Sequence, residues 1–545
     1  MSENIKITIV MDDEKLNMRF GAHDEHSVIM THDSSMTIMS TLLKNSLISG
    51  SFCGGRGDCG RCKIQFLKGM TVPTPLERSV MEPEELRQGY RLACLARPKD
   101  DCVIKLALED CPKIDIVSDM IGVTENDDCM SQQKWKTEKH KSDVMESAAT
   151  MIAVDLGTTT IAMHLMTLDT GQVMDTYCEM NPQRRYGADV LSRIKESCDG
   201  NRDILQKSVT EVLERGVSRF ISRSCGQSVI VKGMCIAGNT TMEHLLMGYD
   251  VSSLGSSPFT PVEIGLQEYS HPAWDFPVWL APGISTFVGG DIVAGLYALG
   301  MLPDGIMTEQ APVNMKNTRY VNDTGTGMDS DTGVGIGVRR GAALLIDLGT
   351  NGEMAITDGS RMIVTATAAG PAFEGGAGAG IVGSDMIACA ASLLQKGIMD
   401  ETGLLAEPYF TEGVTVGEPP VRLHNKDIRD LQLAKAAVRA GVEILWKQMG
   451  EPEIGHVWLA GGFGYYLNVD AAFRIGLLPE HMRGRVLAVG NTSLAGAFRI
   501  GRDLCADRID KQTLERSISS IESINLAKQE AFERLYVQHI DFRQE

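Results

Sequence analysis

Residues 151–160 read MIAVDLGTTT, and residues 344–353 read LLIDLGTNGE. In each stretch an apolar strand ends in an aspartate and a Gly-Thr turn follows, after which alternating residues predict the next strands of a β-meander. The two aspartates, Asp155 and Asp347, are 192 positions apart. Solenoid repeats are far shorter, roughly 20–50 residues, so this repeat predicts two similar lobes.

The turn after each aspartate suits phosphate binding. Its backbone N–H groups and hydroxyls can cradle phosphate oxygens while the aspartate positions Mg²⁺ through water. A third turn, in VWLAGGFG at 457–464, lets a nucleobase and ribose lie against the backbone. One such Asp-x-Gly-Thr turn is a weak signal, because any strand-to-turn junction can produce it. Two copies at lobe spacing are much stronger, with structural hairpins alone as the alternative.

In this order the three turns resemble the phosphate-1, phosphate-2 and adenosine motifs of the actin-like ATPase superfamily, which includes sugar kinases and heat-shock ATPases. The resemblance implies a two-lobed α/β domain with internal duplication that binds ATP–Mg²⁺ between its lobes. Helical stretches such as 427–449 fit between and after the meanders. The nucleotide-binding residues that follow from it are Asp155, Gly157, Thr158, Thr159, Thr160, Asp347, Gly349, Thr350, Asn351, Gly461, Gly462 and Gly464.

The N-terminal part carries a different motif, the run FCGGRGDCGRC with Cys53, Cys59 and Cys62, followed by Cys94. Four thiolates can hold a [2Fe–2S] cluster, and the glycines of the run let backbone N–H groups approach the sulfurs. Zinc and buried inert cysteines are the competing interpretations, although a zinc site usually shows two CxxC-like pairs and inert cysteines would not come with four glycines. The run resembles that of ferredoxin-like [2Fe–2S] domains with the β-grasp fold. Its first gap of five residues is more similar to the adrenodoxin type than to the plant type.

The surrounding pattern predicts a multidomain chain. An α+β, β-grasp ferredoxin-like domain occupies residues 1–110, with strands at 5–9, 63–67 and 102–108, a helix at 37–47 and a Gly/Cys loop at 51–62. Residues 111–148 are polar and without period, which indicates a linker. The actin-like ATPase domain then spans 149–545, with lobes at 149–340 and 341–545.

Some polar and cysteine-containing stretches receive no function. Residues 310–340 are rich in Gly, Asp, Asn and Thr, which predicts a long surface loop. Their Asp-x-Asp pattern faintly suggests Ca²⁺ ligands, but the expected downstream glutamate is missing. Cys102, Cys111 and Cys129 have spacings of no familiar site and are interpreted as ordinary thiols.

Composition excludes several classes of function. The 545 residues include 52 Lys and Arg against 71 Asp and Glu, a net charge of −19. So acidic a chain without a basic stripe repels phosphate backbones, so we expect no nucleic-acid partner. The start lacks a signal-peptide pattern, and no run of about 18 apolar residues follows. We therefore expect a cytoplasmic protein with no membrane partner and with reduced cysteines.

Three further motifs narrow the family: CIAGNTTMEHLLMG at 235–248, FVGGDIVAGL at 287–296 and TAAGPAFEGG at 367–376. With the turns above, and behind a cluster domain, they resemble the ATP-dependent reductive activators of corrinoid proteins. The resemblance implies ATP-dependent one-electron reduction of an inactive Co(II) corrinoid protein to Co(I), through the [2Fe–2S] cluster, to reactivate a corrinoid-dependent methyltransferase system. It implies a corrinoid protein and an upstream low-potential electron donor as partners, and a homodimer stays open.

Hydrolysis of ATP needs a group that positions water, and Asp291 and Glu353 are the carboxylates that rank first. Asp291 lies where related ATPases carry a catalytic acidic or amide residue, just before a connecting helix. A place in the Mg²⁺ shell or a helix-capping role is equally open for both. Two other functions also stay open: a kinase-like phosphotransferase with a redox-sensing cluster, and an ATP-switched binding or chaperone module.

Overall fold

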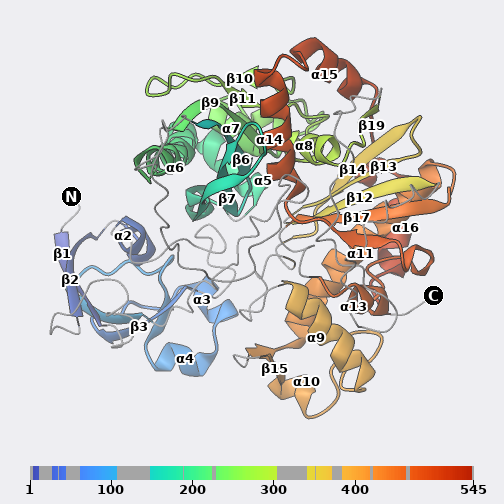
Figure 1. Cartoon of the computed structure of the whole chain (residues 1–545). Helices are drawn as coiled ribbons and strands as arrows, with labels where there is room; N and C mark the ends of the chain where they lie inside the picture. Colours follow the sequence, from blue (N-terminus) through green and yellow to red (C-terminus); the bar gives the residue numbers. More distant parts are fainter. Residues whose placement is uncertain are drawn as a thin grey trace, which may run out of the picture. The chain divides into compact units, whose positions relative to one another are not determined.

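The computed structural model describes residues 4–10, 27–34, 36–44, 62–106, 148–187, 189–223, 229–303, 341–349, 351–370, 373, 383–417, 421–461 and 467–542. By backbone proximity the chain divides into two compact units. The first consists of Met1–Lys113 with Met180–Asn201, and the second of Ile114–Glu179 with Arg202–Glu545. Figure 1 labels the elements of both.

The first unit is built on a five-stranded mixed sheet in the order β2-β1-β5-β3-β4. Its strands are β1 (Asn4–Val10), β2 (Ser27–Asp33), β3 (Lys63–Lys68), β4 (Tyr90–Leu92) and β5 (Cys102–Leu106). β1 runs antiparallel to β2 and parallel to β5, whereas β3 is antiparallel to both neighbours. Isoleucines alternate with polar residues along β1, so Ile5, Ile7 and Ile9 are buried on one face.

Helix α2 (Ile38–Lys44) shares its core with the buried face of this sheet. The same unit holds α3 (Pro75–Val80), α4 (Pro83–Arg87), the 3-10 helix η1 (Pro182–Arg185) and α5 (Val190–Glu196). The predicted strands at 5–9 and 63–67 and the α+β arrangement are confirmed. The predicted helix at 37–47 and strand at 102–108 are confirmed as far as Lys44 and Leu106. Residues 45–61 and 107–147, which hold most of the predicted loop and linker, lie outside the described residues.

The second unit contains two six-stranded sheets. The first, in the order β10-β11-β9-β6-β7-β8, consists of β6 (Ala148–Leu156), β7 (Thr160–Thr167), β8 (Val173–Met180), β9 (Val229–Gly238), β10 (Gln267–Glu268) and β11 (Val278–Leu280). The second, in the order β18-β17-β12-β13-β14-β19, consists of β12 (Ala342–Leu348), β13 (Gly352–Thr357), β14 (Met362–Thr367), β17 (Ile454–Ala460), β18 (Val486–Ala488) and β19 (Glu522–Ser523).

These two sheets follow one plan. The central strands β6 and β12 each pair antiparallel with the next strand of a meander and parallel with β9 or β17 on the other side. Asp155 lies beside Ala237 of β9, and Asp347 lies beside Ala460 of β17. Equivalent strand order and register confirm the predicted internal duplication into two lobes.

The helices of this unit are α6 (Arg202–Arg223), α7 (Thr240–Met247), α8 (Gly290–Ala298), α9 (Gly383–Gln395), α10 (Tyr409–Glu412), α11 (Asn425–Gln448), α13 (Val469–Arg474), α14 (Thr492–Cys505), α15 (Lys511–Ser519) and α16 (Glu530–Gln538). A small hairpin of β15 (Val414–Val416) and β16 (Val421–Leu423) accompanies them. The predicted helix at 427–449 is confirmed as α11.

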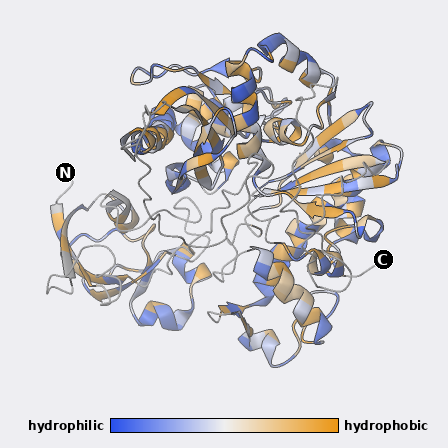
Figure 2. Cartoon of the chain, viewed as in Figure 1, coloured by the Kyte–Doolittle hydropathy of each residue, from blue (hydrophilic) through white to orange (hydrophobic). Residues whose placement is uncertain are grey.

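Helices α8 and α14 join the two lobes. They pack so closely that a Cβ on Gly496 would collide with the backbone oxygen of Ala294. One core contains residues of both helices and of both sheets, including Ala153 of β6 and Leu345 of β12. A second core lies between the other face of the second sheet and α9, α11 and α13. Figure 2 shows apolar residues running along β12, β13 and β14, as burial on both faces requires.

Two further expectations concern the loop at 310–340 and membrane-spanning helices. The predicted loop at 310–340 lies outside the described residues. Among the helices that are described, none has the length and apolar content needed to span a bilayer.

Candidate functional site

Two of the four predicted cluster cysteines lie side by side. Cys62 directly precedes β3 and Cys94 follows β4, and the two strands pair at Lys63 and Leu92. The Sγ atoms of Cys62 and Cys94 are 3.2 Å apart, well beyond the roughly 2.05 Å of a disulfide bond. Both side chains are buried, and neither forms a disulfide. Adjacent buried thiols of this kind fit a thiolate-bound cluster.

The backbone next to Cys94 is fixed by two buried charged residues. The carboxylate of Glu77 accepts a hydrogen bond of 2.8 Å from the backbone N–H of Leu92. The guanidinium of Arg91 donates to the backbone oxygen of Thr71 at 2.8 Å. Because buried charges are stable only when paired or hydrogen-bonded, these contacts hold β4 in one position. Cys94 therefore follows a strand whose backbone these contacts fix.

In the first lobe, the turn between β6 and β7 presents hydroxyl groups. A Cβ on Gly157 would lie 2.7 Å from the backbone oxygen of Thr160, so this tight turn requires glycine. Thr158 and Thr159 are both buried within the turn. The side-chain amide of Asn239 donates to Oγ1 of Thr158 at 2.9 Å. The first lobe thus offers a compact set of donors at the end of β6.

Asp155, at the end of the same strand, is held by residues from the start of α14. Nδ2 of Asn491 donates to one carboxylate oxygen at 2.7 Å, and Oγ of Ser493 donates to the other at 3.1 Å. Burial raises the pKa of Asp155, and the two hydrogen bonds oppose that rise. Asn491 and Ser493, from the second half of the sequence, thereby fix the orientation of the Asp155 carboxylate in the first lobe.

In the second lobe, the turn between β12 and β13 carries two acids. Asp347 pairs across the strands with Glu353, and the backbone N–H of Gly349 donates to the oxygen of Asn351 at 3.0 Å. Gly461 follows β17 with a φ of +85°, and a Cβ there would lie 2.5 Å from Oδ1 of Asp347. Only glycine fits this conformation and this close approach.

A group of carboxylates with raised pKa values gathers around the first turn of α8. Burial raises the pKa of Asp291 to about 7, and the charge of Asp155 adds to the rise. Burial also raises the pKa of Glu353 well above its usual value, with further contributions from Asp291 and Asp347. The pKa of Glu243, buried in α7, rises for the same reason and through Asp291. Raised pKa values in such a group are typical of sites that handle protons.

Four residues of this site were not singled out from sequence: Asn239, Glu243, Asn491 and Ser493. A signal for the asparagines exists, because Gly-Asn-Thr occurs at both 238–240 and 490–492. Each copy follows a strand, and in each the asparagine caps the next helix, α7 or α14. Because the repeat is only three residues long, its role in the site becomes clear only from the contacts that the two asparagine amides make with Thr158 and Asp155.

The remaining predicted residues are placed as follows. Thr160 is the first residue of β7. Cys53, Cys59, Thr350, Gly462 and Gly464 lie outside the described residues. Within the described part of the chain, no three His, Cys, Asp or Glu side chains gather closely enough to hold a metal ion by themselves.

One part of the chain is a sheet that brings two cysteine thiols together, and another is a duplicated unit in which an aspartate ends each of two equivalent strands. This combination is that of an iron–sulfur protein joined to an actin-like ATPase. Family models agree with this class. Residues 23–99 match the 2Fe-2S iron-sulfur cluster binding domain, and residues 150–304 match the RACo middle region. Residues 341–379 and 377–545 match the C-terminal domain of RACo, the ASKHA domain. The chain belongs to the RACo family.

Individual relatives are distant. The corrinoid activation enzyme RamQ of Eubacterium limosum is 27% identical over 411 residues, which cover 64% of this chain and 63% of RamQ. The Co(II) methylated amine-specific corrinoid protein reductase of Methanosarcina barkeri is 21% identical over 458 residues, which cover 72% of this chain and 76% of the reductase. A solved reductive activator for corrinoid, iron-sulfur protein covers 98% of both chains at 22% identity, with a TM-score of 0.57. The last likeness shows a shared fold, and the chain spans less than two thirds of RamQ.

Proposed function

We propose that this chain is an enzyme that uses ATP to drive one-electron reduction of a Co(II) corrinoid protein to Co(I), and so reactivates a corrinoid-dependent methyltransferase system. The observation that carries the proposal is the union of the buried Cys62–Cys94 thiol pair with a duplicated ATPase unit on one chain. Two relatives support it, since one is named for corrinoid activation and the other for reduction of a Co(II) corrinoid protein.

In this proposal Cys62 and Cys94 hold a [2Fe–2S] cluster together with Cys53 and Cys59. When bound, the cluster supplies single electrons that come from an upstream low-potential donor. Burial of Cys62 and Cys94 would shield their part of the cluster from water, and the hydrogen-bonded backbone of β4 would hold Cys94 in place.

ATP is required because the electron has to run uphill. A plant-type [2Fe–2S] centre lies near about −400 mV, and the family resemblance implies a lower potential for the Co(II)/Co(I) couple. Each 59 mV or so costs about a factor of ten in a one-electron equilibrium. Nucleotide binding can offset that cost only if the ATP and ADP states differ in affinity for the complex with the corrinoid protein.

The two turns would bind the phosphates, and Gly461 with Gly462 and Gly464 would face the adenosine. In the first turn, the buried hydroxyls of Thr158 and Thr159 would donate to phosphate oxygens. Mg²⁺ takes few protein ligands and keeps several waters and phosphate oxygens. Asp155 and Asp347 are suited to hold such an ion through water, and the second turn contributes Gly349, Thr350 and Asn351.

Asp291 is the proposed water-positioning base. A general base works best when its pKa is near the working pH, and the pKa of Asp291 is about 7. Burial and the charges of Asp291 and Asp347 raise the pKa of Glu353 above its usual value, so its carboxyl is the second group that could handle a proton here.

The proposal assigns the cluster domain to residues 1–110, a linker to 111–148 and the ATPase lobes to 149–340 and 341–545. A polar linker at these residues would let the cluster domain approach the cobalt while the lobes hold the partner. A cytoplasmic location belongs to the same proposal. A homodimer stays open, and the mass of the protein in solution would decide it.

The test is anaerobic mixing of the reduced full-length protein with a Co(II) corrinoid protein, with and without ATP–Mg²⁺, followed by visible spectroscopy. Co(I) should accumulate only with ATP. Cys59→Ala should hydrolyse ATP and form no Co(I), whereas Asp347→Ala should keep a reducible cluster and form no Co(I). If Asp347→Ala drives Co(II) fully to Co(I) from a donor near the cluster's own potential, ATP is not the energy source. ATP-dependent phosphorylation of a small molecule without Co(I) formation would instead identify the phosphotransferase.

A further inference from the structure

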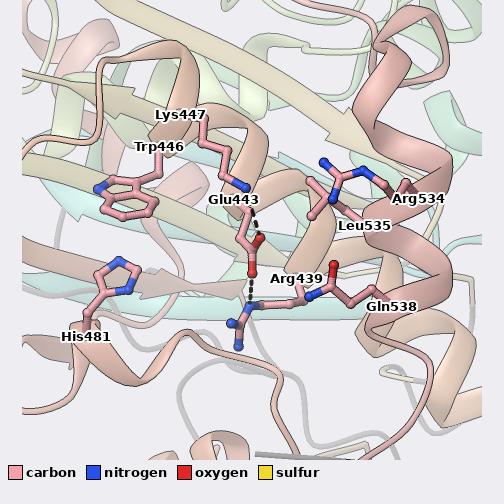
Figure 3. Close-up of a pocket in the computed structure, with 8 residues that line it drawn as sticks. All are labelled: Arg439, Glu443, Trp446, Lys447, His481, Arg534, Leu535 and Gln538. Atoms are coloured by element: carbon pink, nitrogen blue, oxygen red, sulfur yellow. Dashed lines mark hydrogen bonds and ion pairs between the residues drawn. The ribbon is translucent and has the colours of Figure 1, made fainter. Parts of the chain in front are cut away.

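A pocket of about 290 Å³ lies in the second lobe between α11, α16 and the 3-10 turn at Glu480–Met482. Figure 3 shows the side chains that line it: Arg439, Glu443, Trp446, Lys447, His481, Arg534, Leu535 and Gln538. None of them belongs to the residues proposed for the nucleotide or the cluster. The volume is at the lower end of the range of small-molecule sites.

The lining is basic although the chain is acidic. Three permanent cations, Arg439, Lys447 and Arg534, face one carboxylate, that of Glu443. In a protein with a net charge of −19, such a local excess is unlike the rest of the composition. In Figure 3 the ammonium of Lys447 and the guanidinium of Arg534 extend from α11 and α16 toward the space between the helices.

The one carboxylate is already satisfied. Oε1 of Glu443 lies 2.9 Å from Nε of Arg439 and 2.9 Å from Nε2 of His539. Burial would raise the pKa of Glu443, but His539 and Arg439 outweigh burial and hold it at about 2. Lys447 lies farther away, with its Nζ 3.7 Å from Oε2 of Glu443. Glu443 is therefore ionised at neutral pH, and its Oε1 is engaged by the buried side chains of Arg439 and His539.

The positive charges of Arg534 and Lys447 are not neutralised by a close carboxylate among the described residues. Arg534 has no hydrogen bond or ion pair with any residue that the structure describes, and its side chain is exposed. With the part of the chain that the structure describes, Lys447 makes only the long contact to Glu443, and its side chain is 44% exposed. Across the pocket, the rings of Trp446 and His481 stack with centroids 4.4 Å apart, and the indole N–H of Trp446 donates to the backbone oxygen of Pro452. Trp446 and His481 are held by this stacking and by the hydrogen bond of the indole, and they place no carboxylate in the pocket that would repel an anion.

We propose that this pocket binds a small oxyanion that carries two or more negative charges, such as a phosphate ester or a polycarboxylate. Arg534 and Lys447 would contact the anion directly, because both hold donors that face the pocket and lack a close partner. Arg439, fixed by Glu443, would supply positive charge from the floor. Charge-assisted hydrogen bonds from a guanidinium and an ammonium suit an oxyanion better than a neutral ligand.

The experiment uses the full-length protein saturated with a non-hydrolysable ATP analogue and Mg²⁺, so that the proposed nucleotide site is occupied. Inorganic phosphate and citrate are titrated separately by calorimetry, with tryptophan fluorescence as a second readout. We expect one site per chain for at least one of the two anions. Arg534→Gln and Lys447→Gln should each weaken its binding about tenfold, and Trp446→Phe should remove the fluorescence change.

The matched control is Arg516→Gln, which removes the same charge from an exposed position on α15, outside the pocket. It should leave the anion affinity within about twofold of wild type. Failure of both anions to bind at millimolar concentration would overturn the proposal, as would equal losses in Arg516→Gln and Arg534→Gln. Binding of phosphate alone supports a compact dianion site, and binding of citrate alone supports a polycarboxylate site. Unchanged circular dichroism in the variants keeps either result interpretable.

Discussion

The two lobes of the second unit share strand order and register, yet their equivalent turns are built differently. Opposite Asp155 on the neighbouring strand lies Ala162, whereas opposite Asp347 lies Glu353. The first aspartate is held by side chains, Asn491 and Ser493, that approach from α14. The second is approached by the backbone of a glycine and has a second acid beside it.

This difference shows how a duplicated scaffold can divide one task. The first turn, with its buried hydroxyls and hydrogen-bonded aspartate, is arranged to hold an anion and an ion in a fixed place. The second turn adds a carboxyl of high pKa, which suits it to proton handling. We therefore expect binding functions to concentrate in the first lobe and chemistry between Asp291 and the second.

The largest effect is expected from removing either aspartate. Asp155→Ala and Asp347→Ala should each reduce ATP hydrolysis about 100-fold or more, because the charge that orients Mg²⁺ is lost. The visible spectrum of the cluster should stay unchanged, since the cluster cysteines belong to the other unit. Phosphate release and absorption spectra measure both. Asp275→Ala, at an exposed loop position, is the matched control. Normal hydrolysis in both aspartate variants would disprove the nucleotide-site assignment.

A pH profile separates Asp291 from the acid of the second turn. Because the pKa of Asp291 is raised to about 7, its carboxyl is protonated below that pH and ionised above it. ATP hydrolysis should therefore rise about tenfold per pH unit below neutrality and level off above it. Asp291→Asn should lower the plateau and abolish the rise.

Glu353→Gln is the companion to this measurement. In our proposal Asp291 is the base and Glu353, whose pKa is also raised by burial, is not, so the Glu353→Gln variant should keep the rise in ATP hydrolysis with pH. A wild-type profile that is flat from about pH 5.5 to 8.5 would contradict the assignment of Asp291 as the base. So would an Asp291→Asn variant with an unchanged profile.

Much of this fold could be predicted because its signals are local. Alternating apolar residues around Asp155 and Asp347 define strands through their period of two, and a Gly-Thr turn ends each strand. The cysteine spacing likewise identified Cys62 and Cys94, which the structure brings together. Patterns of this kind need no knowledge of tertiary contacts.

The partners within the site could not be predicted in the same way. Asn491 and Asp155 are 336 positions apart, and their contact depends on how α14 packs against β6. Glu243 faces the acid group only because α7 follows β9 beside the repeat strand. Neither Asn491 nor Glu243 stands out in the sequence, since helix-capping asparagines and acids in a first turn are common.

A smaller effect is expected at the glycine that approaches the second aspartate. Gly461→Ala places a Cβ 2.5 Å from Oδ1 of Asp347 at a φ of +85°. Asp347 must then move, and ATP affinity should fall about tenfold. Gly450→Ala has the same backbone strain, with a φ of +86° and no atom within 4 Å of the new Cβ. It should lose about 1 kcal/mol of stability and no affinity. Equal affinity losses in both variants would assign the effect to strain alone.

The smallest effect tests how far the first turn depends on α14. Asn491 caps this helix through Leu494 N–H at 2.8 Å and also donates to Asp155 at 2.7 Å. Serine is a comparable cap but lacks the amide, so Asn491→Ser should keep the cap, about 1 kcal/mol, and lose the second contact. Without that donor the pKa of Asp155 should rise further, because the hydrogen bond now opposes burial.

We expect Asn491→Ser to raise KM for ATP roughly threefold to tenfold, with the deficit shrinking as pH increases and Asp155 ionises. Asn468→Ser makes the same exchange at the cap of α13, where the asparagine side chain accepts a hydrogen bond from Ala471 N–H, and should leave KM unchanged. A KM shift that does not vary with pH would mean that Asn491 positions the turn sterically. No shift at all would make the contact between α14 and Asp155 purely structural, and the two lobes would then differ only by the added acid of the second turn.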